Sequence, residues 1–242
     1  MAATAGRIAT DFAHAFEQSA PDLVVVRADR FEILPITMAA AYMNIPIAHL
    51  EGGDVTGTID ESVRHATTKV AHLHFVTNED AKKRILRMGE PAKYIHNVGA
   101  PEVEIIAAVD RNAPLPIDVP ERFLLVLQHP VTTEYGENKK NAAALLEAVN
   151  EVGVPALWLS PNADAGGAEI TAAIEEFRAR KGGREHIRFS PYLSADAFNI
   201  LLSRTACFVG NSSAGLKETS YLGVPVVNIG TRQQGRWRGK NV

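Results

Sequence analysis

The sequence predicts an α/β protein made of two Rossmann-like domains. Short apolar runs, typical of buried strands, alternate with amphipathic stretches, typical of helices, along nearly all 242 residues. The alternation is interrupted at residues 111–120, which contain three prolines and no periodicity, and it then starts again. Strands that alternate with helices imply a parallel sheet covered on both faces. We therefore expect a domain at residues 1–112 and a second at residues 113–242.

The first half is expected to contain four strands separated by helices. Residues 5–19 carry apolar side chains at helical spacing and end before Pro21. Thr58 and Glu61 have the spacing of a capping box, so a helix is expected to begin there and to run to about residue 70. The expected strands cover residues 23–26, 45–50, 72–76 and 94–98, and the other two helices cover residues 31–43 and 78–88.

The second half repeats the same alternation after the Pro-rich stretch. The expected strands cover residues 123–127, 157–159, 187–189, 207–209 and 224–229. The expected helices cover residues 137–152, 167–181, 194–203 and 214–222. Ligands of open α/β sheets bind beyond the carboxyl ends of the strands, so the loops after these strands are where chemistry is expected.

Composition excludes several classes of partner. A net charge of -3 argues against nucleic acid, whose binding proteins usually carry a basic face. The longest apolar runs are too short for a membrane span, and the first residues lack the pattern of a signal peptide, so a cytoplasmic protein without a membrane partner is expected. His72 and His74 share one face of a strand, but no further ligands stand out, so no metal is expected.

Carboxylates follow the strands of the first half. Asp29 and Glu51 come directly after the first two strands and Asp60 lies further along the second loop, while His129 follows the first strand of the second half. Carboxylates crowded in a desolvated cleft raise one another's pKa, which suits general acid and base roles. The alternative is that these are ordinary loop acids. Asp60 can simply favour a helix N-terminus, and Arg64 can simply pair with it.

A second group of polar residues surrounds the strand at 207–209. Ser212 and Ser213 stand in a turn between that strand and a helix, where hydroxyls and free N–H groups suit a phosphate or diphosphate. Glu218 lies early in the helix and can accept hydrogen bonds from a ribose. Arg232 follows the last strand and can bind phosphate oxygens as a fork. A capped helix and a solvated surface arginine are equally open interpretations.

Taken together, these stretches resemble the hydrolysing UDP-N-acetylglucosamine 2-epimerases. The resemblance is collinear and covers nearly the whole chain. The segments that carry it are residues 28–32, 49–65, 127–133, 161–166, 210–213 and 228–233. It implies a glycosyltransferase-B-like fold with the active site in the interdomain cleft, and a reaction without a metal or redox cofactor.

The family's reaction gives the matching residues their expected roles. UDP is eliminated from UDP-N-acetylglucosamine with loss of the C2 proton, and water then adds to the resulting glycal from the other face at C2, giving free N-acetylmannosamine. The positions that match the family's acid–base residues are Asp29, Glu51 and Asp60, with His129 and Arg64 nearby; which carboxylate removes the proton stays open. The positions that match its UDP-binding residues are Ser212, Ser213, Glu218, Arg232 and Arg30, with the uracil near Tyr192.

The resemblance also sets the context and the alternatives. It implies a role in sialic-acid-type sugar biosynthesis and a homodimer or homotetramer. The family has an additional strand before the segment that matches residue 1 and further helices after residue 242, so a chain truncated at both ends is expected. Four alternatives stay open: an epimerase for UDP-diacetamido-bacillosamine, a glycosyltransferase, a non-hydrolysing epimerase and a non-catalytic fragment that binds UDP-sugars.

Overall fold

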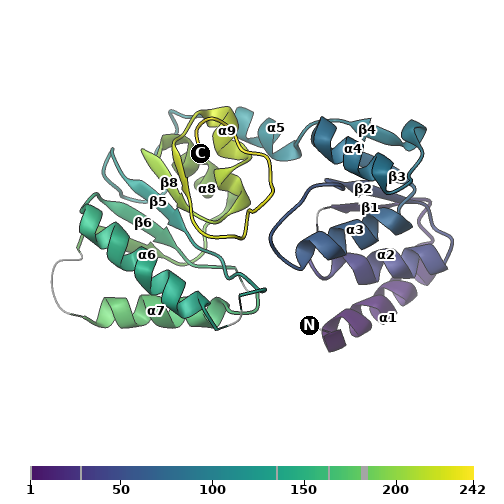
Figure 1. Cartoon of the computed structure of the whole chain (residues 1–242), viewed down its shortest axis with the longest axis horizontal. Coiled ribbons are helices and arrows are strands. Elements are labelled where there is room, and N and C mark those ends of the chain that lie inside the picture. The colour runs from purple at the N-terminus through teal and green to yellow at the C-terminus, as the bar shows by residue number, and fades with distance from the viewer. Residues whose placement is uncertain (1, 28, 135, 163, 181–184) are drawn as a thin grey trace. The chain divides into compact units, whose positions relative to one another are not determined.

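The computed structural model describes residues 2–27, 29–134, 136–162, 164–180 and 185–242. The chain divides into two compact units, Met1–Pro101 and Glu102–Val242. Each unit is an α/β structure built on a parallel sheet (Figure 1). The division falls before the Pro-rich stretch, whereas the sequence placed the boundary after residue 112. Residues 102–112 therefore belong to the second unit.

Unit 1 has a sheet of four parallel strands in the order β1-β2-β3-β4. The strands are β1 (Val24–Arg27), β2 (Ile47–Leu50), β3 (Leu73–Val76) and β4 (Ile95–Asn97). The helices are α1 (Ala2–Ser19), α2 (Ile33–Tyr42), α3 (Asp60–Val70) and α4 (Glu79–Arg87), with a 3-10 turn η1 (Ala92–Tyr94). All four expected strands are present, each within two residues of its predicted limits.

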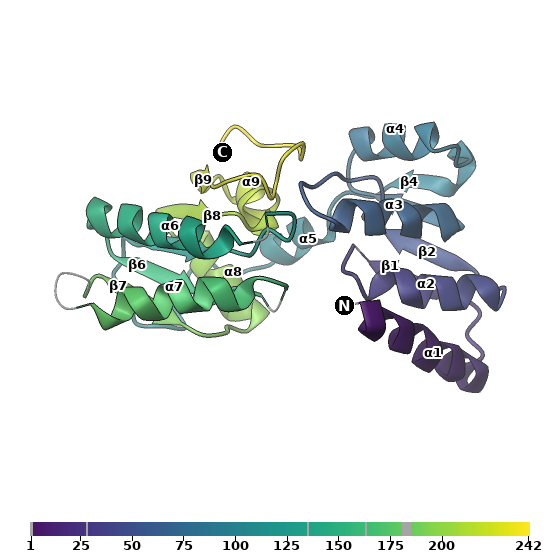
Figure 2. The ribbon, with the colours of Figure 1, turned by 60° about the horizontal axis from the view of Figure 1, so that its bottom comes forward.

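The helices of unit 1 pack on one face of its sheet. The chain steps across the sheet in a single direction, and right-handed crossovers then place every helix on the same side. Phe16 and Ala40 pack there against Ile47, and Ile85 packs against Ile95. Figure 2 shows α1 to α4 as one row of helices.

The other face of this sheet is open within the described residues. Val25 is 60% exposed there, and Phe75 stacks on the exposed His96 with ring centroids 5.7 Å apart. The expectation of a sheet covered on both faces is therefore met on only one face of unit 1, as far as the described part of the chain goes.

Unit 2 has a sheet of five parallel strands in the order β7-β6-β5-β8-β9. The strands are β5 (Leu124–Leu127), β6 (Ala156–Leu159), β7 (Ile187–Ser190), β8 (Cys207–Gly210) and β9 (Val226–Asn228). The helices are α5 (Pro101–Ala107), α6 (Asn138–Val152), α7 (Gly167–Ala179), α8 (Ala195–Arg204) and α9 (Glu218–Leu222), with a 3-10 turn η2 (Ser213–Gly215).

The strand order of unit 2 reverses between β5 and β8. The chain runs outward from β5 to β7 and then crosses to β8, so α6 and α7 cover one face and α8 and α9 the other (Figure 1). Trp158 and Phe177 are buried in the core on the first face, and Leu125 and Phe208 in the core on the second. Sheets of this kind bind ligands beyond the carboxyl ends of the strands at the point of reversal. That point is the end of β5 and β8.

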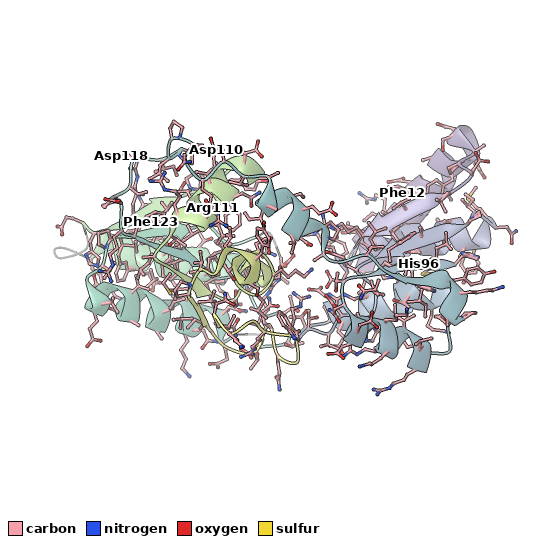
Figure 3. All side chains as sticks on the ribbon, turned by 90° about the horizontal axis from the view of Figure 1, so that it is seen from above. Phe12, His96, Asp110, Arg111, Asp118 and Phe123 are labelled. Atoms are coloured by element: carbon pink, nitrogen blue, oxygen red, sulfur yellow. The ribbon has the colours of Figure 1, made fainter. Side chains whose placement is uncertain are left out.

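The Pro-rich stretch is part of the surface of unit 2. Leu115, Ile117 and Val119 are partly buried against the core below α8, and the Arg188 guanidinium donates to the carbonyl of Asp118. Figure 3 shows this segment crossing unit 2 between Asp110 and Phe123. It contains no helix or strand, as the sequence predicted.

Two local predictions are wrong. The helix expected over residues 214–222 is interrupted: the N–H groups of Leu216 and Lys217 both donate to the Ser213 carbonyl, which closes a turn, and α9 begins only at Glu218. The expected capping box does not form either. The Glu61 carboxylate accepts from the backbone N–H of Thr56 at 2.8 Å, outside the helix end that it was expected to cap.

Candidate functional site

The carboxyl edge of the unit 1 sheet carries an ion pair between predicted site residues. Arg64 projects from α3 and is 2% exposed. Its guanidinium donates to the Asp29 carboxylate and, at 2.9 Å, to the carbonyl of Asp54. Because the same buried guanidinium contacts both Asp29 and Asp54, it holds the Asp29 carboxylate in one position relative to the loop that follows β2.

Glu51 has an unusual backbone conformation at the end of β2. Its φ is 63°, in the left-handed region that non-glycine residues seldom occupy, and its side chain is almost fully buried. Its N–H donates to the Phe75 carbonyl at 2.8 Å, and Arg27 donates to its carboxylate at 3.4 Å. Backbone strain of about 1–2 kcal/mol at such a residue persists where the surroundings enforce it, and it clusters at functional sites.

The loop after Glu51 packs closely on α4. Gly53 has φ +81°, and a Cβ atom there would lie 2.5 Å from the carbonyl oxygen of Ala81. The Asp54 carboxylate accepts from Thr77 at 3.2 Å and from Asn78 at 3.4 Å. The loop is therefore a rigid support for Glu51 and Asp29.

The other two predicted residues of unit 1 are more exposed. Asp60 is the first residue of α3 and half-buried, and its carboxylate accepts from the Thr58 hydroxyl at 3.0 Å. Arg30 donates as a fork to Glu32 over 3.2 and 3.1 Å. Although burial acts to raise the pKa of Glu32, the hydrogen bond and charge of Arg30 hold that pKa below its usual value. The predicted contact of Arg30 with UDP stays a prediction.

The carboxyl edge of the unit 2 sheet is organised around Asn211, which follows β8 and is fully buried. Its side-chain oxygen accepts from the N–H of His129 at 2.7 Å, and its side-chain nitrogen donates to the His129 carbonyl at 2.8 Å. Its own carbonyl accepts from Gln233 at 2.8 Å and from Arg232 at 3.2 Å. The loops after β5, β8 and β9 are thus joined at one residue.

His129 is held in one neutral form. The backbone N–H of Asn162 donates to its Nδ1 at 3.2 Å, so Nδ1 is an acceptor and, in the neutral ring, Nε2 carries the hydrogen. Burial, and then the positive charge of Arg232, lower the pKa of His129 from 6.5 to about 3. At neutral pH the imidazole is therefore a hydrogen-bond donor through Nε2 and carries no charge.

Close approach of β5 and β8 requires the glycine that precedes Asn211. Gly210 has φ +142°, and a Cβ atom there would lie 2.0 Å from the carbonyl oxygen of Leu127. No side chain larger than hydrogen fits between these strands. The glycine allows the His129 loop and the Asn211 loop to meet.

The remaining predicted residues of unit 2 lie around this edge. Ser212 is buried, and its hydroxyl accepts from the N–H of Ala214 at 3.4 Å at the start of η2, with Ser213 next to it. Glu218 is half-buried at the start of α9, and Tyr192 is 89% exposed after β7. Because the helix that was to begin at residue 214 is broken, free N–H groups contribute less to anion binding than the sequence suggested. The roles of these residues stay predictions.

Sequence reasoning missed Asn211, Gln233 and Asn162. Asn211 and Gln233 lie in segments that carry the family resemblance, but an amide has no charge that marks it as a site residue. The signal that finds Asn211 is its place directly after a strand-ending glycine, at the strand where the order reverses. Asn162 acts through its backbone, which leaves no mark in the sequence.

Two further observations concern metal ions and membranes. Among the described residues, no group of three or more His, Cys, Asp or Glu side chains is arranged to hold a metal ion. Within the same ranges, no helix has the length and apolar character needed to cross a membrane. What the two edges do offer is fixed carboxylates in unit 1 and fixed hydrogen-bond donors in unit 2.

Known proteins of similar sequence name a common activity. The chain is 35% identical over 248 aligned residues to the hydrolysing UDP-N,N'-diacetylbacillosamine 2-epimerase of Legionella pneumophila, covering 100% of this chain and 65% of that protein. It is 33% identical over 250 aligned residues to the UDP-N-acetylglucosamine 2-epimerase of Neisseria meningitidis, covering 100% of this chain and 64% of that protein. The chain thus spans just under two thirds of the length of these relatives.

Solved structures confirm the predicted fold class. A crystal structure of UDP-GlcNAc 2-epimerase from Neisseria meningitidis, bound to UDP-GlcNAc, matches with a TM-score of 0.78 at 18% identity, over 96% of this chain and 65% of that one. The fold is therefore the expected glycosyltransferase-B-like pair of Rossmann-like units, while an active site between the units stays a prediction. The model of the UDP-N-acetylglucosamine 2-epimerase family matches residues 1–242. With a match over its whole length, the chain belongs to the UDP-N-acetylglucosamine 2-epimerase family.

Proposed function

We propose that this protein is a hydrolysing 2-epimerase that converts UDP-N-acetylglucosamine into N-acetylmannosamine and UDP. The observation that carries the proposal is the joining of three strand-end loops at Asn211, which holds His129 and Arg232 as donors beyond the point of strand reversal. An uncharged N–H donor and a guanidinium suit the oxygens of a diphosphate. Relatives that carry the epimerase name support the choice of ligand.

The first step is an elimination. A carboxylate of the unit 1 edge removes the C2 proton, the freed electron pair forms a C1–C2 double bond, and the bond from C1 to the UDP oxygen breaks. Negative charge accumulates on the departing diphosphate, where the Arg232 guanidinium and the His129 Nε2–H stabilise it. The candidate bases are Glu51, Asp29 and Asp60.

The second step is hydration of the glycal. Water adds across the double bond, so that C1 receives the hydroxyl and C2 receives a proton on the face opposite to the one that lost it. The delivery of a proton to one face and its removal from the other require two acid–base groups on either side of the ring. The fixed position of Asp29 beside Arg64 and the close packing of the loop after Glu51 support these carboxylates as candidates for the two groups.

The expected setting follows from the same proposal. Free N-acetylmannosamine is a starting material for sialic-acid-type sugars, so we place the protein in such a route and in the cytoplasm, where nucleotide sugars are made. The predicted dimer or tetramer stays a prediction.

A second candidate substrate is UDP-2,4-diacetamido-trideoxyglucose, the bacillosamine sugar. The 35% identical relative from Legionella pneumophila, which carries that name, favours it. The two sugars share the acetamido group at C2 and therefore the elimination chemistry, but they differ at C4 and C6. Selection between them depends on the groups that contact those positions.

The test is to incubate the protein with each UDP-sugar and to identify the products by chromatography and mass spectrometry. The proposal predicts free N-acetylmannosamine and an equal amount of UDP from UDP-N-acetylglucosamine, with a higher kcat/KM than for the bacillosamine sugar. Formation of UDP-N-acetylmannosamine without a free sugar would indicate the non-hydrolysing reaction. Preference for the bacillosamine sugar would favour the second candidate.

A further inference from the structure

The side chain of Asn211 makes more hydrogen bonds than it needs to fill space in the core. Its side chain is buried, yet it is used as a complete amide: the oxygen accepts from the N–H of His129 and the nitrogen donates to the carbonyl of the same residue. The two bonds, of 2.7 and 2.8 Å, fix both the position and the orientation of one peptide segment. Only an amide side chain offers a donor and an acceptor side by side in this way.

The backbone of Asn211 is as constrained as its side chain. Its N–H donates to the carbonyl of Leu127 at 3.2 Å, which holds it to the end of β5. Its carbonyl accepts from Gln233, which is 1% exposed, and from Arg232. Arg232 and His129 come from loops far apart in the sequence, and both are positioned relative to Asn211.

The ring of His129 has one tautomer as a result. With its backbone held by Asn211, its Nδ1 lies 3.2 Å from the N–H of Asn162 and accepts from it. Nε2 therefore carries the hydrogen, and it makes no hydrogen bond to another described residue of the protein. The low pKa of the ring, about 3, agrees with this uncharged state.

We propose that Asn211 is the positioning residue of the diphosphate site, which sets the His129 Nε2–H donor and the Arg232 guanidinium in a fixed relation to one another. The proposal rests on the proposed function for the identity of the ligand, a nucleoside diphosphate. It goes beyond that function because one uncharged residue, Asn211, positions both donors. Asn211 acts through His129 and Arg232 and not by its own contact with the ligand.

The substitution Asn211→Asp tests this directly. A carboxylate has the same shape as the amide and still accepts from the His129 N–H, but it cannot donate to the His129 carbonyl, so two acceptors oppose each other. The segment should shift, Nδ1 should lose its bond from Asn162, and the ring should sample both tautomers. A donor that no longer points at the ligand loses its hydrogen bond to the charged diphosphate, which weakens binding by roughly 10- to 100-fold.

Asn199→Asp is the matched control. Asn199 is also a buried asparagine of unit 2, 8% exposed, but it lies within α8 and not in a loop that follows a strand. Both variants place a carboxylate in the interior of unit 2, so both are expected to lower the midpoint of thermal unfolding. Asn211→Ser, which is too short to reach both backbone groups of His129, replaces Asn211→Asp if that variant does not fold.

The experiment measures three quantities for each protein: the 15N shifts of the His129 ring, the Kd for UDP, and the unfolding midpoint. We expect wild type and Asn199→Asp to show the Nε2–H tautomer and equal UDP affinity. We expect Asn211→Asp to lose the single tautomer and to bind UDP roughly 10- to 100-fold more weakly. An unchanged His129 tautomer in Asn211→Asp or Asn211→Ser overturns the proposal, and so does an unchanged UDP affinity. Failure of wild type to bind UDP contradicts the proposed function, while the His129 tautomer in the variants still decides the role of Asn211.

Discussion

At the scale of single residues, the candidate site contains side chains that their neighbours hold in one position. Glu51 is held in a left-handed backbone conformation at the end of β2, and Asp29 is held by the buried Arg64. His129 is held by Asn211 in one neutral tautomer. The sequence predicted Asp29, Glu51 and His129 from their places after strands. It could not predict what fixes them, because these contacts join positions far apart in the chain.

Replacement of Glu51 by glutamine tests its role as an acid–base residue. Glu51→Gln keeps the shape of the side chain but removes its ability to take a proton, so kcat should fall by at least about 100-fold while the Kd for UDP changes less than about twofold. Steady-state kinetics and calorimetry with UDP measure the two quantities. Equal losses of turnover and of UDP affinity would mean that Glu51 supports the nucleotide site instead.

Removal of the Arg232 guanidinium tests its assignment to the diphosphate. Arg232→Ala should weaken UDP binding by roughly 10- to 100-fold, since a hydrogen bond to a charged group contributes about 1.5–3 kcal/mol. The control is Arg238→Ala, which removes an exposed arginine from the same segment. If both variants bind UDP as wild type does, Arg232 has no part in the site.

The low pKa of His129 has a consequence for stability. Because the folded-state pKa, about 3, lies below the unfolded value of 6.5, the unfolded chain binds a proton as pH falls through 6.5 and the folded chain does not. The free energy of unfolding therefore falls progressively as the pH is lowered from 6.5 to about 3. The stability that comes with the neutral, buried imidazole is fully present only above pH 6.5. Urea unfolding at pH 7 and pH 4.5 should show a smaller loss of stability for His129→Gln than for wild type. The control is His14→Gln, which replaces an exposed histidine. If the free energy of unfolding falls equally between pH 7 and pH 4.5 in wild type and His129→Gln, or if His14→Gln reduces that fall as much as His129→Gln does, the low pKa of His129 is contradicted.

At the scale of elements, the sequence predicted the strands within two residues and the helices from α1 to α4 and from α6 to α8 within three, but it missed α5 and the break before α9. The strands β5 (Leu124–Leu127) and β8 (Cys207–Gly210) follow local runs of apolar residues, which can be read directly from the sequence. The break between η2 and α9 depends on tertiary packing instead: a Cβ atom on Gly215 would lie 2.9 Å from the Phe208 ring, so this turn lies close against the sheet. Such an approach cannot be seen from helical periodicity.

The contact of β5 with β8 gives a prediction at this scale. Gly210→Ala places a methyl group against the Leu127 carbonyl and should lower the free energy of unfolding by about 3 kcal/mol or more. Gly223 is a matched control, because its φ is also positive, +72°, but nothing lies within 4 Å of an added Cβ atom. Gly223→Ala should cost only about 1–2 kcal/mol. Similar losses in the two variants, measured by chemical denaturation, would show that the two strands can separate to accept the methyl group.

At the scale of the whole molecule, the two units carry different polar groups at the carboxyl ends of their strands. Unit 1 presents carboxylates at the ends of strands that run in one order, and unit 2 presents donors where its strand order reverses. The alternation of patterns and the Pro-rich stretch were enough to predict two Rossmann-like units. They were not enough to place the boundary, because α5 has a weak pattern of its own and its Glu102 pairs with Lys217 of unit 2 at 3.5 Å.

The proposed reaction passes through loss and return of the proton at C2, and an NMR experiment can follow that proton. Proton NMR of the protein with UDP-N-acetylglucosamine in D2O follows the C2 hydrogen of the sugar as the reaction runs. We expect free N-acetylmannosamine that carries deuterium at C2, released together with UDP. Free sugar that keeps its original hydrogen at C2, or release of N-acetylglucosamine with UDP, would contradict the elimination and show simple hydrolysis of the bond to UDP.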